Sequence, residues 1–413
     1  MHPEPLRPAP RRTRAGFAIV GCAAMSVIMG PAFARAQAIM DDGRLVVPER
    51  RTLQWATGEG NRELIESTYA RISRLTGSTP GSWSYEWMQV ASHFEARGDD
   101  AARRGDGVRA RSAYLKASLY YALGYFPDNA SPEQKASYAK HLSTYVSASR
   151  FFEHKLEVVA LPLEHSRIVV HLHVPPGVTK PPIVLWNGGV DWWKAGYHSL
   201  IELLIRRGIA VAAFDLPGTG ESAAWTAGLD QGKLHRHVLD HLEQSGRFDF
   251  TRVGMVGVSF GGHYAVRVAA TEPRVKAAVN FCGPIQRIFN APAGVISRVM
   301  ASPEGATLRA AARARGLVPG QEQAGQAERF DLVRLGVVGE GRRIDIPILS
   351  VNGGRDPFAP PEDMDLVQRS APKGEVWRLG TSGHCAVEYG AVVWPQVFDW
   401  LEEKLGTVPP RQQ

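Results

Sequence analysis

The sequence predicts an α/β protein in which a mainly parallel sheet carries helices on both faces and a helical segment precedes the sheet. Three observations predict this class. Residues 60–150 show helical periodicity and no strand pattern, and residues 154–174 alternate apolar and polar side chains as paired antiparallel strands do. From residue 183 onward, short β-rich runs alternate with helical stretches. That alternation is typical of parallel strands joined by helices.

The first domain, expected over residues 45–150, should contain four helices. Apolar side chains recur at close to the helical period over residues 61–75. Residues 83–102 and 108–125 form two further helical stretches rich in Ala, Tyr and Trp. Ser131, followed by a proline, is typical of a helix N-cap with Pro at the first helical position. We expect these helices to form a cap-like layer packed on the rest of the chain.

The second domain, expected over residues 151–410, should contain the sheet. Its predicted parallel strands lie at 183–186, 209–214, 253–256, 277–281, 346–351 and 376–379. Helices are expected between them, near 196–207, 230–245, 261–271, 362–370 and 391–405. Residues 285–343 interrupt the alternation with helical pieces and no convincing strand, so we expect an inserted lid there.

A nucleophile motif lies between a predicted strand and a predicted helix. Gly257-Val258-Ser259-Phe260-Gly261 matches G-x-S-x-G, in which the glycines permit a sharp turn that presents the serine hydroxyl above the sheet. The alternative is a glycine-rich turn that only allows close packing. The strand before the motif and the helix after it favour Ser259 as a nucleophile.

A serine hydroxyl needs a base, and a histidine follows at the expected place. His384 lies in a glycine-rich loop after the last predicted strand, and Asp356 directly follows the preceding strand. Taken alone, His384 could be a solvated loop residue and Asp356 the start of an Asx turn before Pro357. Together they have the order Ser, Asp, His along the chain, which is that of the α/β-hydrolase fold. We predict a Ser259–His384–Asp356 triad.

The oxyanion of a tetrahedral intermediate needs hydrogen-bond donors. One expected donor is the backbone N–H of Phe260 at the start of a helix. The second should come from the loop after the strand at 183–186, where we assign Gly189, with Val190 as the neighbouring alternative. A plain Gly-Gly turn is the structural alternative.

Three tryptophans lie in loops that rise from the carboxyl ends of predicted strands, where an open α/β sheet binds its ligand. Trp192, Trp193 and Trp225 are therefore candidates for an aromatic substrate pocket. Packing against the helical domain is an equally supported role, and the sequence does not decide between the two.

Two other patterns suggest a cofactor or a metal and are not favoured. Gly218–Ala223 matches the G-x-G-x-x-A dinucleotide fingerprint, but no strand ending in an acidic residue follows about 20 residues later. His237, Asp240 and His241 resemble an inverted zinc motif without a third ligand in view. We expect no cofactor and no metal.

Composition places the chain among ordinary globular proteins, with 44% hydrophobic and 22% charged residues. Its formal net charge is +7, but residues 1–36 hold five arginines against one glutamate, so the remainder carries +3. No basic stripe interleaved with aromatic residues occurs, and we expect no nucleic-acid partner.

The N-terminus has the three parts of a secretory signal. A basic region ending at Arg14 precedes the apolar run 16–29, and A-x-A sites follow at 32–34 and 34–36. Residues 1–36 are therefore predicted to be a cleaved signal peptide of a periplasmic or extracellular protein. A permanent anchor is the alternative, although the run is shorter than the roughly 20 residues that span a bilayer. A twin-arginine signal at Arg11 also stays open.

Three cysteines are present. Cys22 could be a lipoprotein acylation site, but the apolar run continues past it. Cleavage would remove Cys22 and leave Cys282 and Cys385, which have no clustered zinc-site spacing. Whether these two pair is not decided by the sequence.

Several motifs together resemble the FrsA-type esterases and the related 2,6-dihydroxypseudooxynicotine hydrolases. They are the helical segment, the loop Asn187–Lys194, the segment Asp215–Ser222 and the turn at Ser259. The resemblance covers residues 60–405 and implies hydrolysis of an ester, or of a carbon–carbon bond next to a ketone, beneath the N-terminal helices. Two features depart from it: the signal peptide, and residues 281–290, which lack the extra acidic residue of the carbon–carbon hydrolases.

The sequence therefore predicts a serine hydrolase that acts on a carboxylic ester through an acyl-enzyme. Carbon–carbon bond hydrolysis or acyl transfer by the same residues is the first alternative. A non-catalytic binding protein on a hydrolase fold is the second. The expected partner is a small-molecule ester or ketone, and a homodimer stays open.

Overall fold

The computed structural model describes residues 49–56, 58–74, 76–126, 131–225, 232–292, 294 and 329–406. All of them belong to one compact unit, residues 36–413. The predicted signal segment, residues 1–36, lies outside the described residues. In the part that is described, no helix is both long enough and apolar enough to cross a bilayer.

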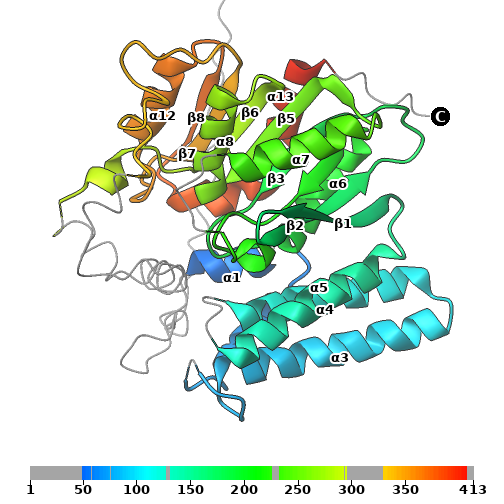
Figure 1. The fold of residues 1–413 in the computed structure, drawn as a ribbon. Helices are drawn as coiled ribbons and strands as arrows, with labels where there is room; N and C mark the ends of the chain where they lie inside the picture. The colour runs from blue at the N-terminus through cyan, green and yellow to red at the C-terminus, as the bar shows by residue number, and fades with distance from the viewer. Residues whose placement is uncertain are drawn as a thin grey trace, which may run out of the picture. The chain divides into compact units, whose positions relative to one another are not determined.

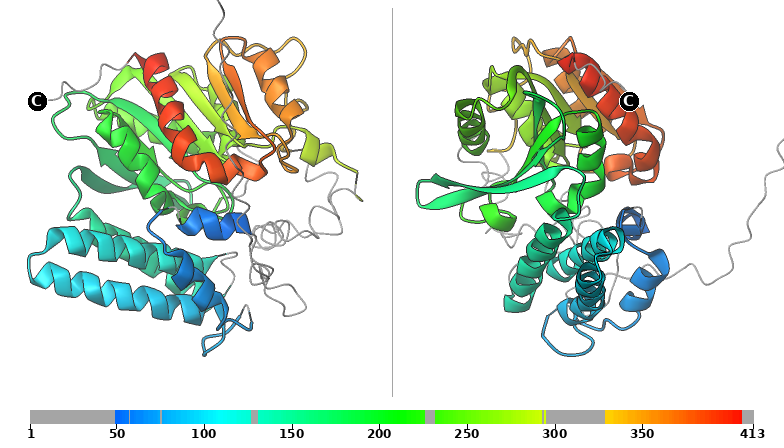
Figure 2. Two further views of the ribbon diagram at one scale, coloured as in Figure 1. Left: turned by 180° about the vertical axis from the view of Figure 1, so that it is seen from behind. Right: turned by 90° about the vertical axis from the view of Figure 1, so that its right-hand side faces the viewer.

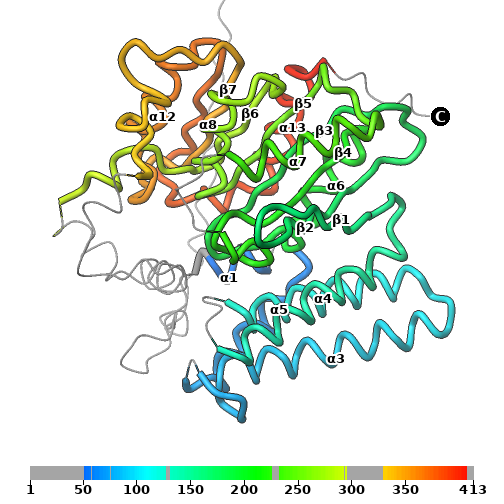
Figure 3. Tube along the Cα trace, viewed as in Figure 1, coloured from blue at the N-terminus to red at the C-terminus, as the bar shows by residue number. Residues whose placement is uncertain are grey.

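Helices come first along the described chain (Figure 1). They are α1 (Glu49–Ala56), α2 (Arg62–Tyr69), α3 (Trp83–Arg103), α4 (Gly107–Tyr125) and α5 (Pro132–Ser149). The trace in Figure 3 shows α3, α4 and α5 running alongside one another. The helix α5 starts at the predicted N-cap, where Ser131 and Gln134 form a capping box. The helix expected over 61–75 is shorter, because turn hydrogen bonds follow Tyr69.

The sheet has eight strands in the order β1-β2-β4-β3-β5-β6-β7-β8. Their bounds are β1 (Lys155–Leu163), β2 (Ser166–Val174), β3 (Pro182–Asn187), β4 (Ala210–Ala213), β5 (Asp249–Val258), β6 (Val275–Phe281), β7 (Ile348–Gly353) and β8 (Glu375–Leu379). The pairings β1–β2 and β2–β4 are antiparallel, and the pairings from β4 to β8 are parallel. The predicted fold class is confirmed.

Helices cover both faces of this sheet, because side chains alternate between faces along each strand. The strand β3 directs Val184 and Trp186 into one apolar cluster, and Ile183 and Leu185 into another. The first cluster includes helices α6 (His198–Arg206) and α13 (Gly390–Leu405), and the second includes α7 (Lys233–Gln244), α8 (Phe260–Thr271) and α12 (Pro361–Ser370). Figure 2 shows α13 on the face opposite α7 and α8.

Buried polar contacts join the N-terminal helices to the loops of the sheet. The Tyr138 hydroxyl on α5 donates to Asp215 Oδ2 at 2.7 Å. The same carboxylate accepts from Lys194 Nζ at 2.8 Å, and Lys194 also donates to Glu221 at 2.6 Å. Burial would lower the pKa of Lys194, but the two carboxylates raise it above its usual value.

The chain changes from helices to strands between Ser149, the last residue of α5, and Lys155, the first residue of β1.

The expected insertion, residues 285–343, lies mostly outside the described residues. Its described ends contain a short 3-10 helix, η4 (Arg287–Asn290), and turns after residue 329. The carboxylate of Asp363 on α12 accepts three backbone N–H groups of residues 285–287. This contact anchors the start of the insertion to the body of the sheet.

Candidate active site

A sharp turn between β5 and α8 presents Ser259. Its backbone angles are φ 54° and ψ −123°, which non-glycine residues rarely adopt. A Cβ at Gly257 would lie 1.9 Å from the carbonyl oxygen of Gly261, and one at Gly261 would lie 2.5 Å from that of Asn187. Glycine at both positions therefore lets the strand and the helix approach closely enough to make the turn.

The structure brings Ser259, His384 and Asp356 together. Ser259 Oγ lies 3.0 Å from His384 Nε2, and His384 Nδ1 lies 2.6 Å from Asp356 Oδ2. The turn after β5, the loop after β7 and the segment η5 (His384–Tyr389) supply the three side chains. These segments meet because the parallel strands β5, β6, β7 and β8 end at the same edge of the sheet.

Asp356 is held in its ionised form. Burial alone would raise the pKa of this carboxyl, but the attraction of His384 and several hydrogen bonds together lower it below its usual value. Besides His384, Asn352 Nδ2 donates to Oδ2 at 2.6 Å and the Phe358 N–H donates to Oδ1 at 2.7 Å. A charged carboxylate in this position can orient the imidazole so that Nε2 faces the serine.

The two predicted oxyanion residues lie close to Ser259. Phe260 is the first residue of α8, and a Cβ at Gly189 would lie 3.5 Å from Ser259 Oγ. The Gly189 N–H donates to the hydroxyl of Tyr197 at 3.2 Å, so it is engaged rather than open. Burial raises the pKa of Tyr197, which keeps this hydroxyl protonated. Among the described residues, Tyr197 has no acceptor for its own hydroxyl hydrogen.

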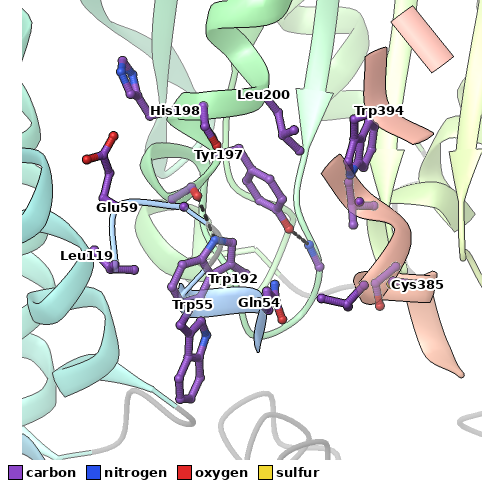
Figure 4. A pocket seen from close by; sticks show the side chains of 18 of the residues that line it. Gln54, Trp55, Glu59, Leu119, Trp192, Tyr197, His198, Leu200, Cys385 and Trp394 are labelled. Atoms are coloured by element: carbon purple, nitrogen blue, oxygen red, sulfur yellow. Dashed lines mark hydrogen bonds between the residues drawn. The ribbon is translucent and has the colours of Figure 1, made fainter. Parts of the chain in front are cut away.

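A cavity of about 330 Å³ opens beside Ser259 and His384 (Figure 4). Apolar side chains that line it include Trp192, Leu200 and Trp394. Polar side chains also line it: Glu59 after α1, Ser118 on α4, His141 and Tyr145 on α5, and His198 on α6. Burial raises the pKa of Glu59, although Lys116 and Arg111 act against that effect.

The three candidate tryptophans do not share a site. Trp192 lines the cavity, and its indole N–H donates to the Gly196 carbonyl at 2.9 Å. Trp193 is not in the cavity wall, because it turns toward α4 and α5, where its ring lies 4.2 Å from that of Tyr125. Trp225 joins the apolar cluster on the α7 and α8 face of the sheet. Packing, rather than a place in this cavity, is what the structure shows for Trp193 and Trp225.

The helix α1 adds to the site from a segment that the sequence patterns do not predict to be helical. Trp55 stacks on Trp192 with ring centroids 6.3 Å apart, and both rings line the cavity (Figure 4). Arg51 donates to the carboxylate of Asp191, and both side chains are buried. No local motif marks this pair, because its members are 140 residues apart.

A disulfide lies next to the site, between Cys282 and Cys385. Within the described residues, the one cluster of three side chains able to ligate a metal consists of these cysteines and His384. The disulfide occupies both sulfurs, so the cluster does not offer three free ligands. In the motif at 237–241, Asp240 instead pairs with Arg274 at 2.7 Å.

Comparison with known proteins identifies the family. The family model described as "Esterase FrsA-like" matches residues 67–406. This chain belongs to the FrsA-like esterase family. The esterase FrsA of Salmonella paratyphi B is 30% identical to this FrsA-like chain over 309 residues, which cover 73% of this chain and 72% of the relative. The esterase FrsA of Photobacterium profundum is 25% identical over 345 residues, covering 81% and 79%.

Solved structures share the fold of this FrsA-like esterase. The 2,6-dihydroxy-pseudo-oxynicotine hydrolase superposes with a TM-score of 0.70 at 21% identity and covers 87% of this chain and 98% of its own. The protein AbyA5 superposes with a TM-score of 0.69 at 22% identity and covers 87% and 95%. At these identities the likeness shows the α/β-hydrolase fold, while the family match shows a hydrolase of the esterase type. The predicted family and enzyme class are confirmed.

Proposed function

We propose that this FrsA-like esterase hydrolyses a carboxylic ester through an acyl-enzyme on Ser259. The observation that carries the proposal is the chain of two hydrogen bonds, 3.0 Å from Ser259 to His384 and 2.6 Å from His384 to Asp356, in the wall of a cavity. His384 takes the serine proton as Oγ attacks the carbonyl carbon, and then donates it to the leaving alcohol. Asp356 stabilises the imidazolium that forms in between.

The oxyanion forms between the start of α8 and the loop after β3. The Phe260 N–H is the first donor, at the positive end of the helix. The second donor is the Tyr197 hydroxyl, which accepts the Gly189 N–H and keeps its own hydrogen for donation. A water molecule, activated by His384, then releases the acyl group and restores Ser259.

The cavity favours a compact ester with an apolar or aromatic group. Its volume of about 330 Å³ lies near the lower limit of small-molecule sites, which range over roughly 300–1,000 Å³. Stacked rings of Trp55 and Trp192 offer an apolar surface in the same cavity that Ser259 and His384 line. The polar side chains of the lining, which include Glu59 and His198, suit a substrate that also carries a hydrogen-bonding group.

The experiment is active-site labelling followed by product analysis. A fluorophosphonate should label the purified protein, Ser259→Ala should abolish labelling, and Ser245→Ala, directly after α7, should keep it. Labelling of Ser259→Ala at the wild-type rate would contradict the proposal and favour a non-catalytic binding protein. A panel of aryl and alkyl esters and aromatic ketones, with and without added alcohol, then separates ester hydrolysis from carbon–carbon cleavage and acyl transfer.

We also propose that the enzyme is exported. The basic, apolar and A-x-A segments of residues 1–36 support this, and so does the Cys282–Cys385 disulfide, since disulfides persist mainly in oxidising compartments. Cell fractionation and N-terminal sequencing of the mature protein test the proposal. Recovery of an uncleaved chain in the cytoplasm would contradict it.

A further inference from the structure

The Cys282–Cys385 disulfide joins the end of β6 to η5, the segment that begins with His384. Cys282 directly follows β6, the neighbour of the strand that carries Ser259, and Cys385 directly follows His384. The two Cα atoms are 4.9 Å apart, although 103 residues separate them in sequence. The cross-link therefore joins the residue after His384 to the body of the sheet.

Both cysteines have backbone conformations that L-residues rarely adopt. The φ angle is 55° at Cys282 and 62° at Cys385, and Ala386 also has a positive φ of 41°. Side chains with a Cβ populate this region at a cost, and they remain there only when surrounding contacts hold them. The cross-link is therefore one of the contacts that can hold this conformation next to His384.

The chain on the amino side of His384 is held in part by the loop after β7, where the Arg355 N–H donates to the Ser382 carbonyl at 2.9 Å. The loop before His384 contains Gly380 and Gly383, and a Cβ at Gly383 would meet nothing within 4 Å. On the carboxyl side, the Cys385 N–H donates to Asn352 Oδ1 at 3.1 Å. Asn352 Nδ2 in turn donates to Asp356 Oδ2 at 2.6 Å, so the position of Cys385 is coupled to the carboxylate that pairs with His384.

We propose that the Cys282–Cys385 disulfide is a positioning element for His384, which fixes the backbone next to the imidazole so that the ring stays between Ser259 and Asp356. This inference rests on the proposed role of His384 as the base. It makes catalysis dependent on the redox state of this one bond. Cys282 is buried, but Cys385 lines the cavity, so a small reductant can reach one sulfur.

Reduction transfers two electrons and two protons from a dithiol to the disulfide, which yields two cysteine thiols and the cyclic disulfide of the reagent. Reoxidation reverses this, with a disulfide such as oxidised glutathione accepting the two electrons and two protons. A displacement of catalytic groups by about 1 Å lowers turnover by about 100-fold. We therefore expect reduction to lower kcat by 10-fold to about 100-fold and to change KM by less than about 3-fold.

The experiment compares oxidised, dithiothreitol-reduced and glutathione-reoxidised protein that carries Cys22→Ser, so that only two cysteines can respond. The rate of fluorophosphonate labelling, kcat and KM are measured well below the unfolding temperature of each form. We expect labelling rate and kcat to fall together on reduction and to recover on reoxidation. Cys282→Ala/Cys385→Ala should match the reduced protein and should not respond to dithiothreitol.

Two outcomes would overturn the inference. In the first, the reduced protein has a lower unfolding temperature but an unchanged kcat, which would mean that the cross-link only stabilises the fold. The second concerns metal, because in the reduced protein the two sulfurs and a His384 nitrogen, which lie within 4.8 Å of one another, could bind zinc. All reductions are therefore repeated with EDTA, and inhibition that disappears with EDTA would assign the effect to metal binding.

Failure of this inference and failure of the proposed function give different results. If Ser259 and His384 do not act as a catalytic pair, the oxidised protein itself is not labelled. If only the inference fails, oxidised and reduced proteins are labelled at the same rate and Ser259→Ala still abolishes labelling.

Discussion

Replacing Arg51 by Met would leave the carboxylate of Asp191 buried without its counter-charge. The two side chains are only 6% and 7% exposed, and no described residue other than Arg51 forms an ion pair with Asp191. Removing one partner of a buried pair costs about 3–5 kcal/mol of unfolding free energy. Because both residues also line the cavity, water can solvate the remaining carboxylate, and we expect Arg51→Met to cost about 3 kcal/mol.

The same substitution should also slow catalysis, since Asp191 is two residues from Gly189. Loosening this loop by about 1 Å should lower kcat by about 100-fold. Urea denaturation measures the stability, and turnover of an aryl ester measures kcat. The matched control is Arg62→Met, because Arg62 forms an exposed pair with Glu66 that should contribute less than about 1 kcal/mol.

A double variant separates the loss of stability caused by the unpaired charge from the loss caused by weaker packing of α1. Arg51→Met with Asp191→Leu removes both charges and should recover most of the lost stability, because apolar replacement of a whole buried pair is often close to neutral. An Arg51→Met variant as stable and as active as Arg62→Met would refute the reasoning. Equal destabilisation of the single and double variants would refute the electrostatic part of it.

Three further predictions follow from the site. Asp356→Asn should lower kcat by about 10⁴-fold with an unchanged far-ultraviolet circular dichroism spectrum, and activity within 10-fold of wild type would contradict its orienting role. Tyr197→Phe should lower kcat by about 100-fold, because it removes the proposed oxyanion donor. The control Tyr120→Phe removes another hydroxyl that accepts a backbone N–H and should leave kcat unchanged. Equal kcat values in the two variants would exclude Tyr197 as a donor. Burial lowers the pKa of His141 to about 4 and of His198 to about 3. Below about pH 6.5 the folded state therefore binds fewer protons than the unfolded state, so the free energy of unfolding should fall as the pH decreases toward 4. Urea midpoints that stay constant over this range would contradict the prediction.

Much of the fold was predictable because patterns of neighbouring residues determine its helices and strands. The six parallel strands follow from short β-rich runs and the five helices from a side-chain period of 3.6 residues, and the structure contains all of them. The sequence did not predict α1, whose eight residues are too few to show a clear period. It also extended the helix at 61–75 beyond Tyr69, where turn hydrogen bonds replace helical ones.

Some residues of the candidate site could likewise be predicted from the sequence and others could not. Ser259, His384 and Asp356 could be placed from the sequence because each follows a strand whose end is fixed by the fold class. The roles of Trp192 and Trp193 could not be predicted from the sequence. Adjacent side chains point in different directions, and only packing decides which of them lines the cavity. The engagement of the Gly189 N–H by Tyr197 likewise depends on how η2 (Lys194–Tyr197) folds back beneath the loop.

By itself, the sequence determined the order of strands and helices, the turn that presents Ser259 and the chain order of the three candidate catalytic residues. The elements and the turn depend on periodicity and sterics within a few residues, and the order of the three residues is part of the sequence itself. Tertiary structure alone decided that Arg51 pairs with Asp191 across 140 residues and that Cys282 bonds to Cys385 across 103. Such contacts depend on which segments packing brings together, and no local pattern of residue types records that.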